Sequence, residues 1–296
     1  MTTDRTERGV LSTHDLNRPG VRGTLGAGRV IVLLALLTAC VGPVLWLGKA
    51  AVSTTKDTLR EPFALWPSGV AWSNLGEAWS TVRIGKYLAN TFWVAGGSSL
   101  LTLVVALTGA YALSVLRPRY AAVLNAAVLA TLFVPTVVVL VPLYLTVLDV
   151  PLLGTNLLNS YWAVWLPAAA NSFIVLVVKR FFDQLPRELF EVAKVDGAGP
   201  YRILWHIVLP MSKPVVGVAA LLTFVTGWKE FLWPMLVLPD AEKQPLSVAL
   251  PRLSETAELS LLMAGLFMSV IIPMVLFLLF QRQFLRAAGQ SGALKG

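Results

Sequence analysis

Residues 185–214 form the longest polar stretch between apolar runs in the second half of the chain. Between positions 186 and 197 the side chains alternate with a helical period, so that one helix face is apolar and the opposite face is charged. The apolar face is formed by Leu189, Phe190, Val192 and Ala193, and the charged face by Arg187, Glu188, Glu191 and Lys194. Pro186 suits the first turn of such a helix, and Gly197 can end it in the left-handed conformation.

This pattern predicts recognition chemistry: a short amphipathic helix over 186–197, a glycine turn, and a second short helix that ends at Pro210. The apolar face would anchor the element, and the charged face with its tight turn would be gripped by another protein. The residues leave a second interpretation open, in which the helix lies on the lipid headgroups as an interfacial element.

A second candidate site is the charged pair Lys229 and Glu230, which follows Trp228 inside an apolar run. Ionisable side chains inside a membrane span are costly, so each of them is a candidate for lining a polar pathway. We expect the pair to lie beyond the middle of the bilayer, about 22 Å along its span at about 1.5 Å per residue. The structural alternative is that these side chains snorkel or form a buried pair with other helices.

Catalytic patterns are absent from the sequence. The sequence contains no phosphate-binding loop and no recognisable Ser/His/Asp or Cys/His catalytic motif. The two histidines, His14 and His206, are not spaced from each other or from other ligand residues as in a metal site. With a single cysteine, Cys40, the chain has no intrachain disulfide. We therefore predict that the protein is not an enzyme and binds no cofactor or metal, and that any energy for uphill transport enters from another subunit.

The composition indicates an all-α membrane protein, since 56% of residues are hydrophobic, 14% are charged and the mean hydropathy is +0.71. Apolar runs near the length that a bilayer of about 30 Å requires recur six times. The predicted transmembrane helices are 29–48, 88–116, 121–148, 161–178, 215–238 and 260–280. The net charge of +8 could suggest a nucleic-acid partner, but the basic bias of one side of membrane proteins explains it more simply.

The spans divide the chain into five predicted regions. They are a disordered tail 1–28, a first span 29–48, an extracytoplasmic loop 49–86, a five-helix core 87–284 and a tail 285–296. Lys and Arg are concentrated in the termini, the Arg117 turn and the 185–214 stretch, which predicts that both termini and this stretch face the cytoplasm.

Two local features of the spans have consequences for packing. The small residues 96–99 of the second span would permit close helix contact. Pro135 and Pro142 should kink the third span.

The 185–214 stretch resembles the "EAA" signature of ABC importer membrane subunits. The matching residues are Glu191-Val192-Ala193, then Asp196-Gly197-Ala198, then Ile207-Val208-Leu209-Pro210, with Val192 in place of the usual alanine. Further likeness to sugar-importer permeases lies in Ala110-Tyr111-Ala112-Leu113, in Val141-Pro142-Leu143-Tyr144, in Gly227-Trp228 with Phe231-Leu232-Trp233-Pro234, and in the final residues 289–296. The chain is thus similar to the second permease of maltose-type transporters, and the likeness spans residues 30–296.

This resemblance implies the type I ABC importer permease fold, with six spans and a cytoplasmic coupling helix between spans four and five. The residues that would dock on an ATPase are Glu188, Glu191, Ala193, Asp196, Gly197 and Ala198. The implied partners are a second permease, two ATPase copies that bind Mg-ATP, an extracytoplasmic solute-binding protein and membrane lipid. The implied location is the prokaryotic cell membrane, the implied solute is a sugar, and no nucleic acid is involved.

One departure from the family pattern concerns the solute. Relatives carry Trp-Asn-Asp-Phe where this chain has Trp228, Lys229, Glu230 and Phe231, so a cation replaces a neutral amide beside the expected pathway. An anionic solute, such as a phosphorylated or acidic sugar or a glycerophosphodiester, is therefore an alternative to a neutral sugar. A self-contained carrier or scaffold is a third alternative, which the near absence of intramembrane carboxylates disfavours.

Overall fold

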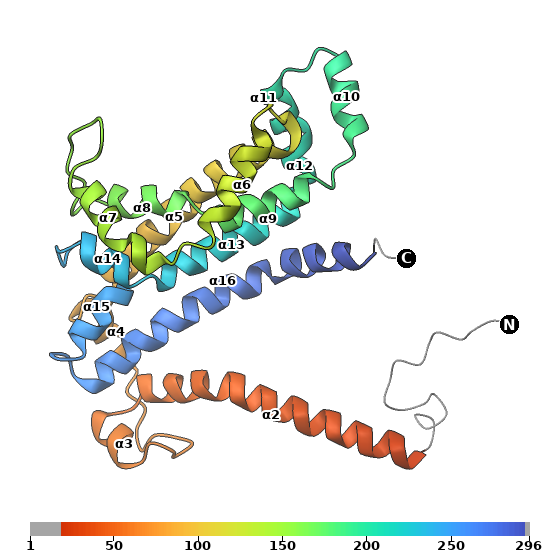
Figure 1. The fold of residues 1–296 in the computed structure, drawn as a ribbon. Coiled ribbons are helices and arrows are strands. Elements are labelled where there is room, and N and C mark those ends of the chain that lie inside the picture. The colour runs from red at the N-terminus through yellow and green to blue at the C-terminus, as the bar shows by residue number, and fades with distance from the viewer. Residues whose placement is uncertain (1–18, 294–296) are drawn as a thin grey trace.

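The computed structural model describes residues 19–293, and the regular elements in that range are helices. Within this range three helices are long and apolar enough to cross a bilayer alone, and three bent helix pairs raise the number of candidate spans to as many as six. Figure 1 shows the long helices extending between two ends of the molecule, with short helices gathered at each end. The predicted all-α class with six spans is confirmed.

The bounds of the elements are as follows. The single spans are α2 (Pro19–Ala51), α5 (Ile84–Tyr111), which the π-helix η1 (Ala112–Leu116) continues, and α16 (Leu259–Ala293). The bent pairs are α6 (Ala121–Thr131) with α7 (Thr136–Leu148), α8 (Trp162–Ala169) with α9 (Ser172–Phe182), and α11 (Pro200–Ile203), η2 (Leu204–Val208) and α12 (Leu209–Met211) with α13 (Lys213–Lys229). The short helices are α3 (Thr55–Arg60), α4 (Ser73–Ser80), α10 (Arg187–Val195), α14 (Leu232–Val237) and α15 (Leu246–Leu253).

The two ends of the chain are more helical than the sequence predicted. Helix α2 begins at Pro19 rather than at position 29, so the prediction of a disordered tail over 1–28 is wrong for residues 19–28, and residues 1–18 lie outside the described part. Helix α16 likewise continues through the predicted tail from 285 as far as Ala293. A helix that is already nucleated in the bilayer can propagate past the hydrocarbon limit, because each added residue contributes a backbone hydrogen bond without a new nucleation cost.

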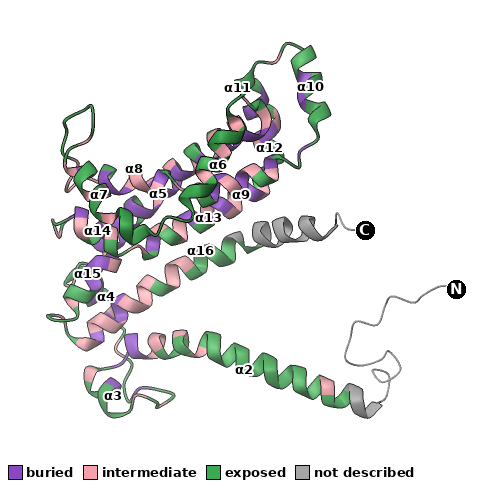
Figure 2. Ribbon diagram, in the orientation of Figure 1, coloured by how far each residue is buried: buried purple, intermediate pink, exposed green. Residues whose placement is uncertain are grey.

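Helix α5 is the centre of the fold, and it packs against α13, α8 and α9. The small residues 96–99 permit this contact, as predicted: a Cβ at Gly97 would lie 2.1 Å from the Trp165 ring of α8. The buried hydroxyl of Ser99 lies 2.6 Å from that of Thr223 on α13. Helix α2, by contrast, packs mainly against α16 near one end, and Figure 2 shows most of its described residues exposed.

The third span is broken rather than kinked. Helices α6 and α7 meet at 105°, and Pro135 stands in extended conformation as the N-cap of α7. A proline disfavours helical backbone in the residue before it and offers no N–H, which suits Pro135 to the start of a helix. Pro142 remains inside α7. The sequence predicted a kink at each proline, but only one of them interrupts the span.

The fourth and fifth spans also differ from their predicted ranges. The helices of the fourth span, α8 and α9, are bent by 44° at a break that Asn171 caps, since its side chain accepts a hydrogen bond from the Ile174 N–H. The predicted fifth span 215–238 is not one helix: α13 ends at Lys229, Glu230 is extended, and α14 starts at Leu232. Position 229 is therefore a helix end instead of a position within a continuous helix.

Candidate functional site

The 185–214 segment contains the predicted amphipathic helix, which is α10. Its N-cap is Pro186, and its charged residues Glu188 and Glu191 are exposed. The predicted apolar face is divided: Phe190 and Ala193 are buried, whereas Leu189 and Val192 are 40% and 61% exposed. Val195, at the end of the helix, is 88% exposed. One edge of the helix thus anchors it to the fold while another edge presents aliphatic side chains outward.

Gly197 ends α10 in the left-handed conformation that the sequence predicted, with φ of 79°. The Gly197 N–H donates to Lys194 O at 3.0 Å, and the Ala198 N–H donates to Ala193 O at 2.8 Å. These two bonds form a Schellman cap, which satisfies the free carbonyls at the helix end. Asp196 is the exposed C-cap residue, and Ala198 is half-buried. The cap fixes the direction in which the chain leaves the helix.

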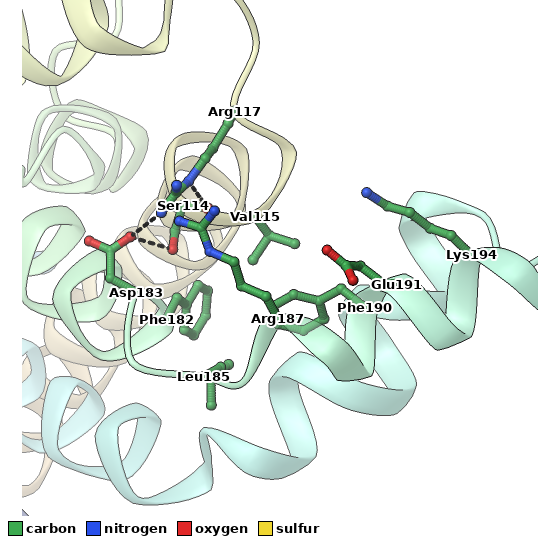
Figure 3. A pocket seen from close by; sticks show the side chains of 10 residues that line it. All are labelled: Ser114, Val115, Arg117, Phe182, Asp183, Leu185, Arg187, Phe190, Glu191 and Lys194. Atoms are coloured by element: carbon green, nitrogen blue, oxygen red, sulfur yellow. Dashed lines mark hydrogen bonds and ion pairs between the residues drawn. The ribbon is translucent and has the colours of Figure 1, made fainter.

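A hollow of about 140 Å³ separates α10 from η1, and Figure 3 shows the side chains around it. Charged residues of both signs line it together with apolar ones. They are Ser114, Val115, Arg117, Phe182, Asp183, Leu185, Arg187, Phe190, Glu191 and Lys194. The hollow is thus bounded by α10 on one side and by η1 and the end of α9 on the other.

Asp183 is the central polar group of this support. It accepts hydrogen bonds from Lys179 Nζ at 2.8 Å and from Ser114 Oγ at 2.7 Å, and it pairs with Arg117 Nη2 at 3.5 Å. Figure 3 shows its contacts with Ser114 and Arg117. Burial raises the pKa of the Asp183 carboxyl, but these hydrogen bonds and the two positive charges outweigh it and hold the pKa below its ordinary value. Sequence reasoning missed this cluster, although the Lys179–Asp183 spacing of four residues was a readable signal.

A second tie holds the chain just after α10. The Tyr111 hydroxyl donates to Pro200 O at 2.8 Å, where α11 begins after the glycine turn. Both ties come from the same end of α5, which widens into the π-helix η1 before Arg117 stops it with φ of 48°. π-Helical turns are rare and are frequent at functional sites. The chain is thus attached to one helix both before and after α10.

The second candidate trio lies at the opposite end of the molecule from α10. Trp228 is 6% exposed, its ring contacts Phe92 and Phe224, and its Nε1 donates to Ser269 O at 3.2 Å. Lys229 is exposed at the end of α13, and no ion pair reaches it from the residues that the structure describes. Trp228 is therefore a packing residue in this chain, and Lys229 is the accessible member of the trio.

Glu230 follows at the break between α13 and α14. Its carboxylate accepts from the Trp233 N–H at 3.4 Å, and its carbonyl accepts from the Ser247 hydroxyl at 2.6 Å. These contacts hold the non-helical backbone in place. Between residues 19 and 293 no group of three or more His, Cys, Asp or Glu is arranged to hold a metal ion.

A polar cluster that the sequence did not reveal joins this end of the fold. The buried Asn90 amide donates to Glu242 O at 2.9 Å and to Gln244 O at 3.0 Å, and it accepts from the Tyr161 hydroxyl at 3.1 Å. The Glu242 carboxylate pairs with Arg83 at 2.7 Å and contacts Lys86 as well. The connection between α14 and α15 is therefore bound to the start of α5.

Comparison with known proteins gives consistent matches. The family described as "Binding-protein-dependent transport system inner membrane component" matches residues 98–287. The sn-glycerol-3-phosphate transport system permease protein UgpE of Yersinia pestis bv. Antiqua (strain Antiqua) is 29% identical over 269 residues, covering 88% of this chain and 91% of that protein. The protein of the same name from Agrobacterium fabrum is 28% identical over 281 residues, with 91% and 96% covered.

Among solved structures, the chain is similar to one from a bacterial ABC transporter involved in the import of the acidic polysaccharide alginate. The TM-score is 0.78 at 22% identity, and the match covers 93% of this chain and 99% of that chain. This likeness establishes the fold.

Proposed function

Because the chain belongs to the family of binding-protein-dependent transport system inner membrane components, we propose that α10 and its glycine cap couple this permease subunit to an ATPase. The chain is a membrane-spanning permease subunit of an ABC importer. The proposal for α10 is carried by one observation: the helix is anchored on one edge by Phe190 and Ala193 and free on the other. A helix that is anchored to the fold on one side and exposed on the other can transmit the movement of a bound partner to the spans that it contacts.

The coupling role assigns a task to each residue of α10 and its cap. Glu188 and Glu191 offer charge to the ATPase surface, and Ala193 seats the helix on the fold. Asp196, Gly197 and Ala198 set the turn that leads to α11. Closure of two ATPase copies around Mg-ATP would move α10, and Asp183 and Tyr111 would pass this movement to α5.

The test compares two glycines with positive φ. Gly197→Asp strains the cap and adds a charge at the proposed contact, whereas Gly154→Asp makes the same change in the connection between α7 and α8, at φ of 57°. Neither glycine has a neighbouring atom within 4 Å of the added Cβ, so the two substitutions are sterically matched. In proteoliposomes containing the whole transporter, Gly197→Asp is expected to abolish ATP-driven uptake while Gly154→Asp retains it. Equal uptake by both variants would remove the coupling role.

A charge reversal gives an independent measurement. Glu191→Lys is expected to lower the amount of ATPase subunit that co-purifies with the chain, because it inverts the charge of the presented face. Glu255→Lys, an exposed position in the α15–α16 connection, is the control for added positive charge. Loss of the ATPase from both variants would point to a general charge effect instead of docking.

We propose that the transporter contains a second permease, two ATPase copies and an extracytoplasmic solute-binding protein, and that both termini of this chain face the cytoplasm of a prokaryotic cell. The concentration of Lys and Arg in alternate loops supports this orientation. Purification of the tagged chain in mild detergent, with subunit stoichiometry by mass spectrometry, is the test. Recovery of the chain alone under conditions that preserve other complexes would favour a self-contained carrier or scaffold.

For the solute we propose a small sugar or polyol derivative that carries negative charge. The similar permeases named above belong to sn-glycerol-3-phosphate transport systems, and the similar structure comes from an importer of an acidic polysaccharide. In this chain an exposed cation, Lys229, stands where a span is interrupted, and interrupted spans line the solute pathway in many transporters.

The solute proposal is tested at Lys229 itself. Lys229→Gln should raise the KM for uptake of an anionic solute about ten-fold, and Lys229→Arg should restore it, because the contact depends on charge. The cognate binding protein is first screened with glycerol phosphates, acidic sugars and neutral sugars to identify the transported class. Normal uptake of the anionic solute by Lys229→Gln would leave the lysine without a role in the pathway.

A further inference from the structure

The apolar run of α2 fixes the level of the bilayer at this helix. Arg29 and Lys49 are its only charged residues between positions 29 and 51, and residues 30–48 between them are uncharged. At about 1.5 Å per residue this stretch measures about 28 Å, which is close to the thickness of a hydrocarbon core. One boundary of the hydrocarbon therefore falls near Gly48, and Trp46 lies just inside it, at the depth that tryptophan favours.

After α3 the chain returns to this level. The Trp46 Nε1 donates to Pro62 O at 2.7 Å, and the Lys49 ammonium donates to Glu61 O at 3.1 Å. Figure 1 shows the connection that follows α3 lying beside the same end of α2. The Lys49 ammonium also lies 3.4 Å from Pro62 O, so Pro62 is held at the level of Trp46 and Lys49, at the boundary of the hydrocarbon. The chain thus turns back toward the membrane after it has left α2.

The residues that follow Pro62 are large, apolar and uncovered. Phe63 is 90% exposed, Leu65 is 96% exposed and Trp66 is 74% exposed. The loop is nevertheless held in shape, because Ser68 Oγ donates to the Asp57 carboxylate and the Ala71 N–H donates to Val52 O at 2.8 Å. A loop fixed at both ends that presents three such side chains at bilayer depth has a large apolar area to bury.

We propose that residues 63–66 are a membrane foot, inserted between the headgroups and acyl chains of the leaflet on the side of the α2–α5 connection. The occupant of this apolar surface is lipid, because the hydrogen bonds to Trp46 and Lys49 set its depth against the apolar run of α2. Phe, Leu and Trp side chains favour this boundary region. The foot holds that end of α2 at a constant depth while the helices packed around α5 move.

The test measures depth directly in the assembled transporter. Cys40, the only cysteine of the chain, is replaced by Cys40→Ser, and a fluorophore sensitive to its environment is attached through Leu65→Cys. The control carries the same fluorophore through Glu255→Cys, an exposed acidic position in the α15–α16 connection. Each is reconstituted in phosphatidylcholine nanodiscs, with or without bromine at a shallow acyl carbon, and iodide serves as the aqueous quencher.

If residues 63–66 insert in the bilayer, brominated lipid should lower the fluorescence emission at position 65 about two-fold, while iodide should have little effect. At position 255, iodide should lower the emission and brominated lipid should have little effect. Strong iodide quenching at position 65 would place the loop in water and overturn the proposal. Protection from both quenchers would mean that protein covers the loop and would also overturn it. The proposal would also be overturned if position 65 became protected from iodide only when the solute-binding protein is added, since that would identify the surface as the docking site of that protein.

Discussion

The two ends of α5 are both tied to a connection by polar side chains, but the ties differ in kind. At the α10 end the tie is a charged carboxylate, Asp183, whose side chain is 26% exposed and which has three polar partners. At the opposite end the buried tie is a neutral amide, Asn90, bound to two backbone carbonyls. The charged pair there, Arg83 with Glu242, is about half exposed on both sides.

The difference between these two ties suggests two roles: one tie holds the fold rigid, and the other passes movement from one helix to another. An amide that fully satisfies buried carbonyls makes a fixed joint, because each lost bond leaves a polar group without a partner. A carboxylate with several partners can exchange one for another while remaining paired. The Asn90 end is therefore expected to stay rigid, and the Asp183 end is suited to transmit movement of α10.

The largest expected effect is at the fixed joint. Asn90→Leu removes three hydrogen bonds and leaves the carbonyls of Glu242 and Gln244 without a donor, so we expect about 3 kcal/mol of destabilisation. The apparent Tm of the purified chain in nanodiscs measures it. Asn156→Leu is the control: it removes one exposed hydrogen bond, from the Leu158 N–H, and should lower the Tm much less. Equal Tm values for both variants would show that Asn90 is not a fixed joint.

A smaller loss of stability is expected at the transmitting end. Asp183→Asn keeps the shape and the contact with Ser114 but leaves Lys179 and Arg117 without their counter-charge, at about 1–2 kcal/mol. Uptake should fall more than the Tm does, because the contact lies on the route from α10 to α5. A variant with lowered Tm and normal uptake per folded transporter would make Asp183 purely structural.

The same carboxylate gives a pH signature. Because the pKa of Asp183 is lowered in the folded chain, its charge stabilises the fold fully above the ordinary pKa of 3.8, and this contribution disappears as the pH falls through the lowered value. The Tm difference between the wild type and Asp183→Asn should be constant near neutral pH and shrink below about pH 4. A Tm difference that does not decrease at all as the pH falls below 3.8 would contradict the ionic account.

The smallest effect is expected at the exposed ion pair. Arg83→Gln removes the bidentate contact with Glu242, yet half-exposed pairs contribute about 0.5 kcal/mol or less. Lys86 remains beside the same carboxylate. The Tm of Arg83→Gln should differ from that of the wild type by about 1 °C or less, and added salt should change this difference by no more than that. A shift as large as that of Asn90→Leu would reverse the order of the two contacts at this end.

The sequence predicted the parts of the fold that depend on local pattern. Hydrophobic length located the spans, and the 3.6-residue period with Gly197 located α10 and its cap. It did not distinguish the two prolines of the third span, because Pro142 is accommodated inside α7 while Pro135 caps it. Whether a proline stays inside a helix or interrupts it depends on whether neighbouring helices supply hydrogen-bond donors to the carbonyls that the proline leaves free.

The candidate sites were predicted unequally for the same reason. The α10 residues are contiguous, so their types and spacing suffice to find them. Ser114, Arg117 and Asp183 come from two spans, and no local pattern joins them. Trp228 was placed near the pathway by resemblance, but its indole is buried between α5 and α16.

The sequence by itself determined the class of this protein, its spans, and the helix-and-glycine element between spans four and five, because burial in lipid and left-handed backbone each demand particular residues at particular positions. Only the tertiary structure decided where spans break, which half of α10 is buried, and which side chains hold it. Those outcomes depend on contacts between residues far apart in the chain, and the free energy of such contacts is set by the geometry in which the spans pack.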